Sequence, residues 1–264
     1  MLAPRTQQSS RNSDVEDVVT DASMEGKTAV ITGAGRGIGR AIAIGYAKAG
    51  MGVCCSARTG GEIEQTAALI TDAGGRAIAL AADVTDYASV DRLFAGAAQA
   101  LGGIDIVVAS AGGSVENKLV EESDPAAWKH AIDTNLVGAY HTAKAAIPHL
   151  RARGAGKLIF IGSGMGHRSG PTRSAYATSK AGLWMLTRIL AQELVSHGIC
   201  VNELIPGPVL TSFIKGREDA LRAGGAGGEW MKEPEDVVPL ALFIASQPVN
   251  GPTGQTFSLA RREL

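Results

Sequence analysis

Residues 28–39 read Thr-Ala-Val-Ile-Thr-Gly-Ala-Gly-Arg-Gly-Ile-Gly, and this stretch decides the fold. The first five residues form a mostly apolar run, which predicts a buried strand. The glycines that follow let the backbone turn sharply, and a segment of helical period begins at Gly37. Free N–H groups at the start of such a helix favour an anion. A strand that runs through a glycine turn into a helix predicts a phosphate-binding loop; the alternative is a tight turn without a ligand.

The same alternation of short apolar runs and helical segments continues along the chain. It is typical of βαβ units, whose strands pair in parallel and whose crossovers place helices on both faces of the sheet. The sequence therefore predicts an α/β, doubly wound Rossmann fold with a parallel seven-stranded sheet. The predicted strands are 28–32, 52–56, 76–81, 104–109, 157–161, 200–204 and 255–258. The predicted helices are 37–49, 62–73, 87–101, 125–153, 174–196 and 234–245.

Composition limits the kinds of partner that this chain can have. The formal net charge is −1 over 264 residues, which does not favour a nucleic-acid partner or an anionic membrane surface. No run reaches the roughly 18 apolar residues of a membrane span, and residues 1–23 are polar and lack the apolar stretch of a signal peptide. We expect a disordered extension over 1–23, a single domain over 24–264 and a cytoplasmic location.

The cysteines and histidines follow no pattern of ligation. Cys54 and Cys55 are adjacent within an apolar run, which predicts buried core residues, and the five histidines lack metal-ligand spacing. The sequence therefore predicts neither a disulfide framework nor a metal site.

Tyr176 and Lys180 lie one helical turn apart on the same helix face. A free phenol has a pKa of about 10, too high for easy proton exchange at neutral pH. A neighbouring ammonium lowers that pKa, and the same lysine can hydrogen-bond a ribose. Tyr140 and Lys144 repeat the spacing, so the spacing alone does not identify a site.

Ser163 distinguishes the two pairs. It follows the apolar run 158–161, at the carboxyl end of a predicted strand, where open α/β sheets bind ligands. It precedes Tyr176 by 13 residues, and the glycine-rich turn between them can bring its hydroxyl beside the phenol. The residue 13 before Tyr140 is Ala127, which has no donor. We therefore predict that Ser163 and Tyr176 act together, and that the second Tyr-Lys pair is an ordinary helix face.

These motifs together resemble the short-chain dehydrogenase/reductase family, in its shorter single-domain branch. The resemblance spans residues 26–258, and within the family the chain is similar to the 3-oxoacyl-carrier-protein reductases. It is carried by Gly33, Gly37, Gly39, Asp83, Val84, Asn135, Ser163, Tyr176, Lys180, Pro206, Gly207 and Thr211. Two segments depart from the family pattern. Residues 109–112 read Ala-Ser-Ala-Gly where the family usually has Asn-Asn-Ala-Gly, and residues 258–264 lack its Val-Asp-Gly-Gly type ending.

The resemblance implies a hydride transfer between a nicotinamide and a carbonyl or carbinol carbon. It implies that Tyr176 exchanges the proton, Ser163 binds the same substrate oxygen and Lys180 holds the ribose. It also implies that Asn135 positions a water that leads protons to the lysine. The expected cofactor contacts are Gly33, Arg36, Gly37, Ile38, Gly39, Arg58, Asp83, Val84, Ser110, Tyr176, Lys180, Val209 and Thr211.

The end of the second strand indicates which nicotinamide cofactor is bound. An acidic residue there accepts from the ribose hydroxyls of NAD(H) and repels a 2′-phosphate. This chain has Ala57 at that position, followed by Arg58, and Arg36 lies in the glycine loop. Two guanidiniums can bind a phosphate dianion, so we expect a preference for NADP(H), with NAD(H) as a possible substitute; the alternative is that both are surface arginines.

Two other functions are alternatives to an oxidoreductase. A hydrolase with a nucleophile elbow needs glycine two residues on either side of Ser163, where this chain has Ile161 and Met165. A catalytically silent or weak dinucleotide-binding module is the second alternative.

The substrate is expected to be a small carbonyl compound or alcohol: a 3-oxoacyl thioester, sugar, steroid or simple secondary alcohol. Its pocket is expected beneath residues 211–230, with Met165, His167 and Phe213 as lining. The family resemblance implies a homo-oligomer, a tetramer, packed through residues 125–153 and 174–196.

Overall fold

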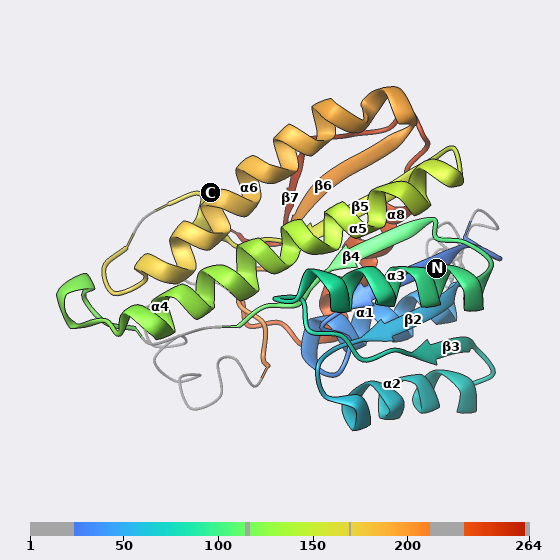
Figure 1. Ribbon diagram of the computed structural model, residues 1–264, viewed down its shortest axis with the longest axis horizontal. Coiled ribbons are helices and arrows are strands. Elements are labelled where there is room, and N and C mark those ends of the chain that lie inside the picture. The colour runs from blue at the N-terminus through green and yellow to red at the C-terminus, as the bar shows by residue number, and fades with distance from the viewer. Residues whose placement is uncertain (1–23, 114–116, 169, 212–229, 262–264) are drawn as a thin grey trace, which may run out of the picture.

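Figure 1 shows the computed structural model of the chain, which describes residues 24–113, 117–168, 170–211 and 230–261. One parallel sheet runs through the molecule with strand order β3-β2-β1-β4-β5-β6-β7. The order reverses direction between β1 and β4, and such a switch point opens a crevice at the carboxyl ends of the strands. The predicted doubly wound α/β fold is confirmed.

The seven strands lie where the apolar runs predicted them, with ends that differ by at most two residues. Cys54 and Cys55 are buried in the second strand, as expected, and Val30 of the first strand pairs in register with Cys54 and Val107. The strands are β1 Thr28–Thr32, β2 Gly52–Ser56, β3 Arg76–Ala79, β4 Ile106–Ala109, β5 Gly156–Ile161, β6 Ile199–Ile205 and β7 Thr256–Ser258.

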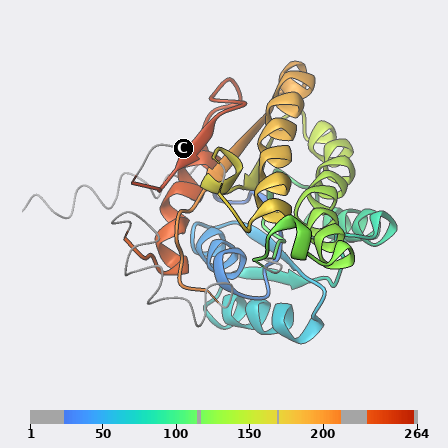
Figure 2. The ribbon, with the colours of Figure 1, turned by 90° about the vertical axis from the view of Figure 1, so that its left-hand side faces the viewer.

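Two layers of helices cover the sheet, as the end-on view shows (Figure 2). One face is covered by α1 Gly37–Lys48, α2 Gly60–Asp72 and α8 Val238–Ser246, which bury Ile42, Tyr46, Ile63 and Ile244. The other is covered by α3 Tyr87–Leu101, α5 Gly138–Ala152 and α6 Ser174–Leu194, which bury Phe94, Leu150, Leu183 and Leu190. Each face therefore has its own apolar core. No helix in the described ranges has both the length and the hydropathy needed to cross a bilayer.

The long helix predicted over 125–153 is interrupted. It consists of α4 Pro125–Ile132, a π-helical turn over Asp133–Val137, and α5. The backbone at Gly138 packs so closely on the chain after β3 that an added Cβ would lie 2.6 Å from Val84 Cγ2. A π turn inserts one extra residue into a helix and is frequent at functional sites. Here the turn carries Asn135.

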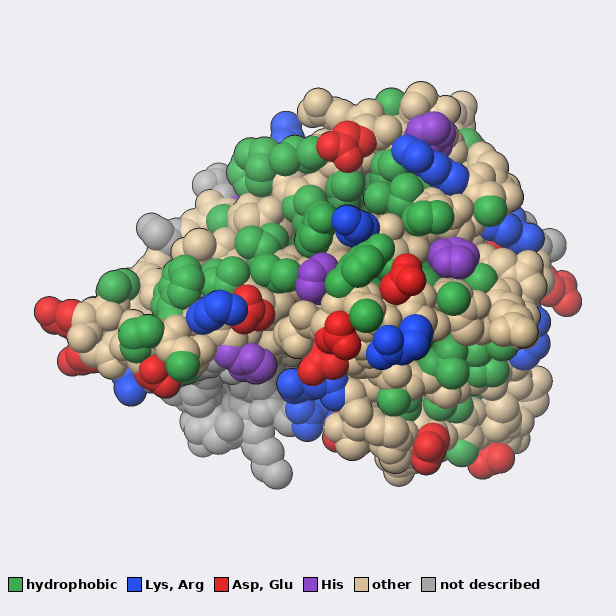
Figure 3. Space-filling model, in the orientation of Figure 1, with side chains coloured by type: hydrophobic (Ala, Val, Ile, Leu, Met, Phe, Trp, Pro, Cys, Tyr) green, Lys and Arg blue, Asp and Glu red, His purple; other side chains and the backbone are tan. Residues whose placement is uncertain are grey.

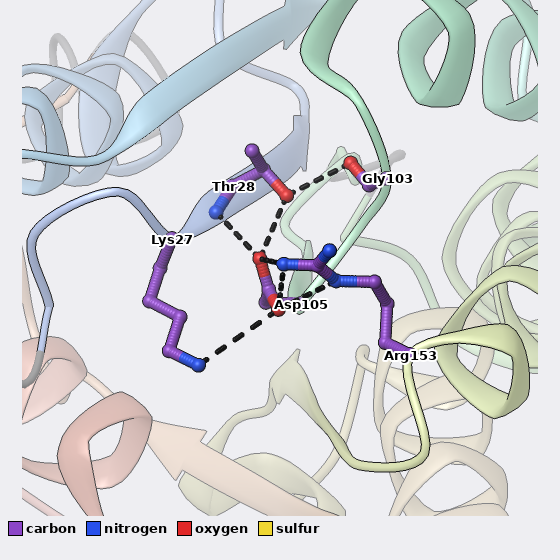
Figure 4. Close-up of polar contacts among 5 residues, drawn as sticks. All are labelled: Lys27, Thr28, Gly103, Asp105 and Arg153. Atoms are coloured by element: carbon purple, nitrogen blue, oxygen red, sulfur yellow. Dashed lines mark hydrogen bonds and ion pairs between the residues drawn. The ribbon is translucent and has the colours of Figure 1, made fainter.

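One carboxylate, Asp105, holds the amino-terminal edge of the sheet together (Figure 4). Asp105 Oδ2 accepts from the Thr28 backbone N–H at 2.9 Å. The Thr28 hydroxyl lies within hydrogen-bonding distance of both Oδ2 (2.9 Å) and the Gly103 carbonyl (2.8 Å). Arg153 donates through Nε and Nη2 at 2.9 and 3.1 Å, and Lys27 Nζ lies 4.0 Å away. This nearly buried group therefore joins β1, β4 and the end of α5.

Replacing this carboxylate should cost stability without touching the opposite edge of the sheet. Asp105→Asn should lower the free energy of unfolding by about 2 kcal/mol, because a neutral amide loses the charge-assisted bonds to Arg153. Urea unfolding at pH 7 measures the loss. Asp91→Asn, at an exposed position of α3, is the control and should stay within about 0.5 kcal/mol of wild type. Equal stability of the two variants would contradict this role for Asp105.

Candidate active site

A cleft of about 940 Å³ opens at the carboxyl ends of the strands. It is bordered by Thr32 at the end of β1, Ser56 at the end of β2 and Ile161 at the end of β5. All the predicted site residues line this single cleft: Gly33, Arg36, Gly37, Ile38, Gly39, Arg58, Asp83, Val84, Ser110, Asn135, Ser163, Tyr176, Lys180, Val209 and Thr211. The structure thus brings together residues from across nearly the whole described chain.

Two glycine positions in the loop after β1, Gly33 and Gly39, leave no room for a side chain. Gly33 has a φ of +70°, and a Cβ there would lie 2.9 Å from the Ala111 backbone. A Cβ on Gly39 would overlap the Gly33 carbonyl, and Gly37 has a φ of +55°. No side chain caps the amino end of α1, so its first N–H groups remain available to an anion. These features fit a pyrophosphate group.

Charged residues mark the end of the cleft beside β2 and β3. Arg36 lies 3.7 Å from Glu62 across an exposed ion pair, with side chains that are 69% and 36% exposed. Burial raises the pKa of Asp83, but hydrogen bonds from Thr85 and the charge of Arg58 outweigh it, so the net pKa is lowered. Asp83 is therefore an anion at neutral pH, and Arg58 lies within reach of its charge.

The unusual segment after β4 is braced by other groups. Thr32 Oγ1 accepts from the Ala111 N–H at 3.3 Å. The Asn135 side chain accepts from the Gly113 N–H and donates to the Gly113 carbonyl, both at 2.9 Å. Asn135 is nearly buried, and these two bonds occupy its amide. The π turn that carries Asn135 therefore holds the loop that forms one wall of the cleft.

Ser163 and Tyr176 meet where β5 ends and α6 begins. Ser163 Oγ accepts from the Met165 N–H at 3.2 Å and hydrogen-bonds the Tyr176 phenol. A Cβ on Gly166 would lie 2.7 Å from the Lys180 backbone, so this turn packs directly on α6. That close approach fixes the serine relative to the tyrosine.

Lys180 is buried behind the tyrosine, with 6% of the residue exposed. Its Nζ donates to the Ile161 carbonyl at 2.8 Å and lies 5.8 Å from the centre of the Tyr176 ring. Burial lowers the pKa of Lys180 to about 8, while the charge of Glu203 opposes that shift. The lysine therefore stays mainly protonated at neutral pH and titrates just above it.

The pKa of Tyr176 differs from the sequence-based expectation. Burial raises it, and the hydrogen bond from Ser163 and the charge of Arg173 oppose the rise. Lys180 was expected to lower this pKa, but its ammonium is directed to the Ile161 carbonyl rather than to the phenol oxygen. Ser163 and Arg173 are therefore the groups that oppose this rise in the pKa of Tyr176.

The second Tyr-Lys pair lies outside the cleft. Tyr140 is 44% exposed on α5. Lys144 Nζ lies over the rings of Tyr87 and Tyr140, 5.2 and 5.9 Å from their centres. This pair is a packed and partly solvated helix face, as the position of Ser163 predicted.

The sequence interpretation missed Glu203. This carboxylate on β6 is fully buried, and its Oε2 accepts from Thr256 Oγ1 at 2.8 Å and lies 2.9 Å from His167 Nε2. A Cβ on Gly162 would overlap Glu203, so glycine is required beside it. A carboxylate within the apolar run 199–205 is the sequence signal that identifies it.

The three side chains expected to line the substrate pocket have different outcomes. Met165 lines the cleft. His167 does not: its ring is turned toward Glu203 and lies 5.2 Å from the Trp184 ring, because the buried carboxylate requires a partner. Phe213 and most of the expected roof, residues 212–229, lie outside the described residues.

Comparison with known proteins gives one consistent family. Residues 27–221 match the family model described as short chain dehydrogenase. The 3-oxoacyl-acyl-carrier-protein reductase FabG of Vibrio harveyi is 33% identical over 236 residues, covering 88% of this chain and 95% of that protein. The 3beta-hydroxysteroid dehydrogenase 1 of Eggerthella lenta is 36% identical over 245 residues, covering 88% and 92%. A solved structure from Beutenbergia cavernae has a TM-score of 0.80 and 35% identity, covering 89% of this chain and 95% of its own. It is described as an NAD(P) dependent gluconate 5-dehydrogenase with bound NADP at low occupancy.

Glu203→Gln should move the pH dependence of carbonyl reduction. The carboxylate raises the pKa of Lys180, so its neutral analogue should let that pKa fall below about 8. The loss of activity with rising pH should then begin about one pH unit lower than in wild type. The measurement is kcat from pH 6 to 10, and Glu193→Gln, at an exposed position of α6, is the control. Identical profiles for the two variants would contradict the coupling of Glu203 to Lys180.

Proposed function

The chain belongs to the short-chain dehydrogenase family, and on that premise we propose that it is an NADP(H)-dependent oxidoreductase for a ketone or secondary alcohol. The observation that carries the proposal is the convergence of Ser163, Tyr176 and Lys180 in the same cleft as the uncapped end of α1. The glycine loop fits a dinucleotide pyrophosphate, and the serine-tyrosine pair supplies two hydroxyls to one substrate oxygen.

Each residue has one part in the proposed reaction. The bound nicotinamide supplies a hydride to the carbonyl carbon in reduction and accepts it in oxidation. In reduction, Tyr176 donates its phenol proton to the carbonyl oxygen, which becomes the hydroxyl of the product. Ser163 holds that oxygen beside the phenol, and Lys180 stabilises the resulting phenolate and binds a ribose hydroxyl. The phenol then regains a proton from solvent, by way of Lys180 and a water that Asn135 positions.

The proposed preference for NADP(H) rests on the charges beside β2. Ala57 leaves the ribose 2′ position without an acidic neighbour, and Arg36 and Arg58 both line this end of the cleft. Glu62 pairs with Arg36 and weakens its field, so we assign the larger share of phosphate binding to Arg58. The NADP in the Beutenbergia cavernae relative supports the same choice.

The substrate is proposed only by its reacting group. The names of the relatives span an acyl-carrier-protein thioester, a steroid and gluconate, so membership of the family leaves the rest of the substrate open. Reduction of a 3-oxoacyl thioester is one candidate within this class. The cytoplasmic location stays a prediction.

We further propose that the chain forms a homotetramer. Tyr140 on α5 and Met185 and Ile189 on α6 are large apolar side chains with 44–46% exposure. Figure 3 shows apolar side chains spread over the face that α5 and α6 form in Figure 1. Such a face fits an isologous contact between two copies. Light scattering at micromolar concentration should give four times the 27.1 kDa of one chain, and a monomer or a dimer would refute the proposal.

Tyr176→Phe tests the proposed chemistry. It removes the only hydroxyl proposed to carry the proton, so kcat for reduction of a ketone panel should fall at least about 1,000-fold. Binding of NADPH, followed by its fluorescence, should survive. Tyr140→Phe is the matched control and should stay within about twofold of wild type. If the control loses activity and Tyr176→Phe does not, the site is assigned wrongly; NADPH binding without turnover in wild type would indicate a silent binding module.

Ala57→Asp combined with Arg58→Leu tests the cofactor assignment. The new carboxylate repels the 2′-phosphate and the lost guanidinium no longer binds it, so the ratio of kcat/KM for NADPH to that for NADH should fall about 100-fold. Arg92→Leu, at an exposed position of α3, is the control and should leave the ratio unchanged. A wild type that prefers NADH, or a double variant that keeps its preference for NADPH, would overturn the assignment.

A further inference from the structure

The charges that line the cleft are distributed unevenly. At the end beside β2, the arginines Arg36 and Arg58 are accompanied by the carboxylates Glu62 and Asp83. The end beside the serine-tyrosine pair has three cationic side chains, Arg168, Arg173 and Lys180. Among the described residues that line the cleft, no carboxylate lies at this second end. The reacting end is therefore the more cationic part of the cavity.

Arg168 differs from three other arginines of the fold, each of which has a side-chain partner. Arg153 is bound by Asp105, Arg40 donates to Thr66 Oγ1 at 3.1 Å, and Arg36 pairs with Glu62. Within the described ranges, Arg168 makes no ion pair and no side-chain hydrogen bond, although it is partly buried in the cleft wall. A guanidinium with five donors in such a place offers a binding site to a carboxylate or a phosphate.

The turn between Ser163 and Tyr176 holds these arginines at the reacting end. Thr172 has a φ of +64°, which is rare for a β-branched residue. Arg173 follows at the start of α6, and its charge reaches the Tyr176 phenol. Arg168 lies on the other side of the turn, next to His167, whose ring is fixed by Glu203. The turn is thus anchored on both sides of the cationic pair.

We propose that the substrate carries an anionic group, a carboxylate or a phosphate, that binds Arg168 with support from Arg173 while the carbonyl group meets Ser163 and Tyr176. This inference rests on the proposed function and adds a substrate class to it. The pyrophosphate of the cofactor is assigned to the glycine loop after β1, whereas Arg168 lies in the loop after β5, and β4 separates these two strands.

The test compares matched substrates with and without the charge. 4-Oxocyclohexanecarboxylate and its methyl ester test a carboxylate. Acetoacetyl-4′-phosphopantetheine and acetoacetyl-pantetheine, which differ only in the phosphate, test a phosphate. Wild type should prefer the charged member of one pair at least tenfold in kcat/KM, and the pair that shows the preference identifies the anion. The inference is overturned if wild type prefers the charged member in neither pair.

Variants of Arg168 assign that preference to its side chain. Arg168→Gln should lower kcat/KM for the charged member about 10- to 100-fold, mainly through KM, and leave the neutral member within about twofold. Arg168→Lys should restore part of the loss, because it returns the charge without the fork of donors. Arg151→Gln, at an exposed position of α5, is the control. The dissociation constant for NADPH should stay unchanged in all variants, which also shows that they fold.

The remaining outcomes are distinct. Equal loss on charged and neutral members would mean that Arg168 shapes the loop and binds no anion. Reduction of neutral ketones without turnover of either charged substrate overturns this inference and keeps the proposed function. Absence of turnover with every carbonyl compound, despite NADPH binding, overturns both.

Discussion

The Lys180 ammonium donates a 2.8 Å hydrogen bond to the carbonyl oxygen of Ile161, at the point where β5 ends. This contact ties the first two turns of α6 to the sheet edge that opens the cleft. The same ammonium lies 5.8 Å from the centre of the Tyr176 ring, and the Tyr176 phenol hydrogen-bonds Ser163, which follows the same strand. Gly166 lets the intervening turn pack on the helix backbone at the lysine. The serine, the tyrosine and the lysine are therefore positioned by one junction between a strand and a helix.

A buried ammonium is costly, and the surrounding fold reduces that cost. Glu203 on β6 supplies an opposing charge, and its own burial is compensated by Thr256 on β7 and by His167. The last strand of the sheet thus contributes to the electrostatics of the site although it does not line the cleft. The ionic cluster around Asp105 lies at the other edge of the same sheet and joins the elements there. The charge of Asp105 therefore stabilises the amino-terminal edge of the sheet, and the separate charges of Glu203 and Lys180 serve the site at the carboxyl edge.

Much of this structure could be predicted from the sequence, because β1, β2, β4, β5 and β6 are buried along their whole length and read as mainly apolar runs. The glycine loop could be predicted because each of its close approaches requires glycine, and Ser163 selected the correct tyrosine because strand ends converge at one edge. The π turn at Asn135 was not predicted, and the residue after it, Gly138, packs closely on Val84, a tertiary contact that sequence patterns do not show. The partners of His167 and Arg36 also escaped prediction. Both are carboxylates far away in sequence, Glu203 and Glu62, and only the folded chain brings them near.

A crystal structure of the chain with NADP⁺ bound tests the central claim most directly. The account predicts that the nicotinamide end lies beside Tyr176, with a ribose hydroxyl on Lys180 Nζ while that nitrogen keeps its bond to the Ile161 carbonyl. It also predicts that the pyrophosphate lies on the amino end of α1. A nicotinamide that lies away from Tyr176, or a Lys180 side chain that leaves Ile161 and makes no contact with the ribose, would contradict the account.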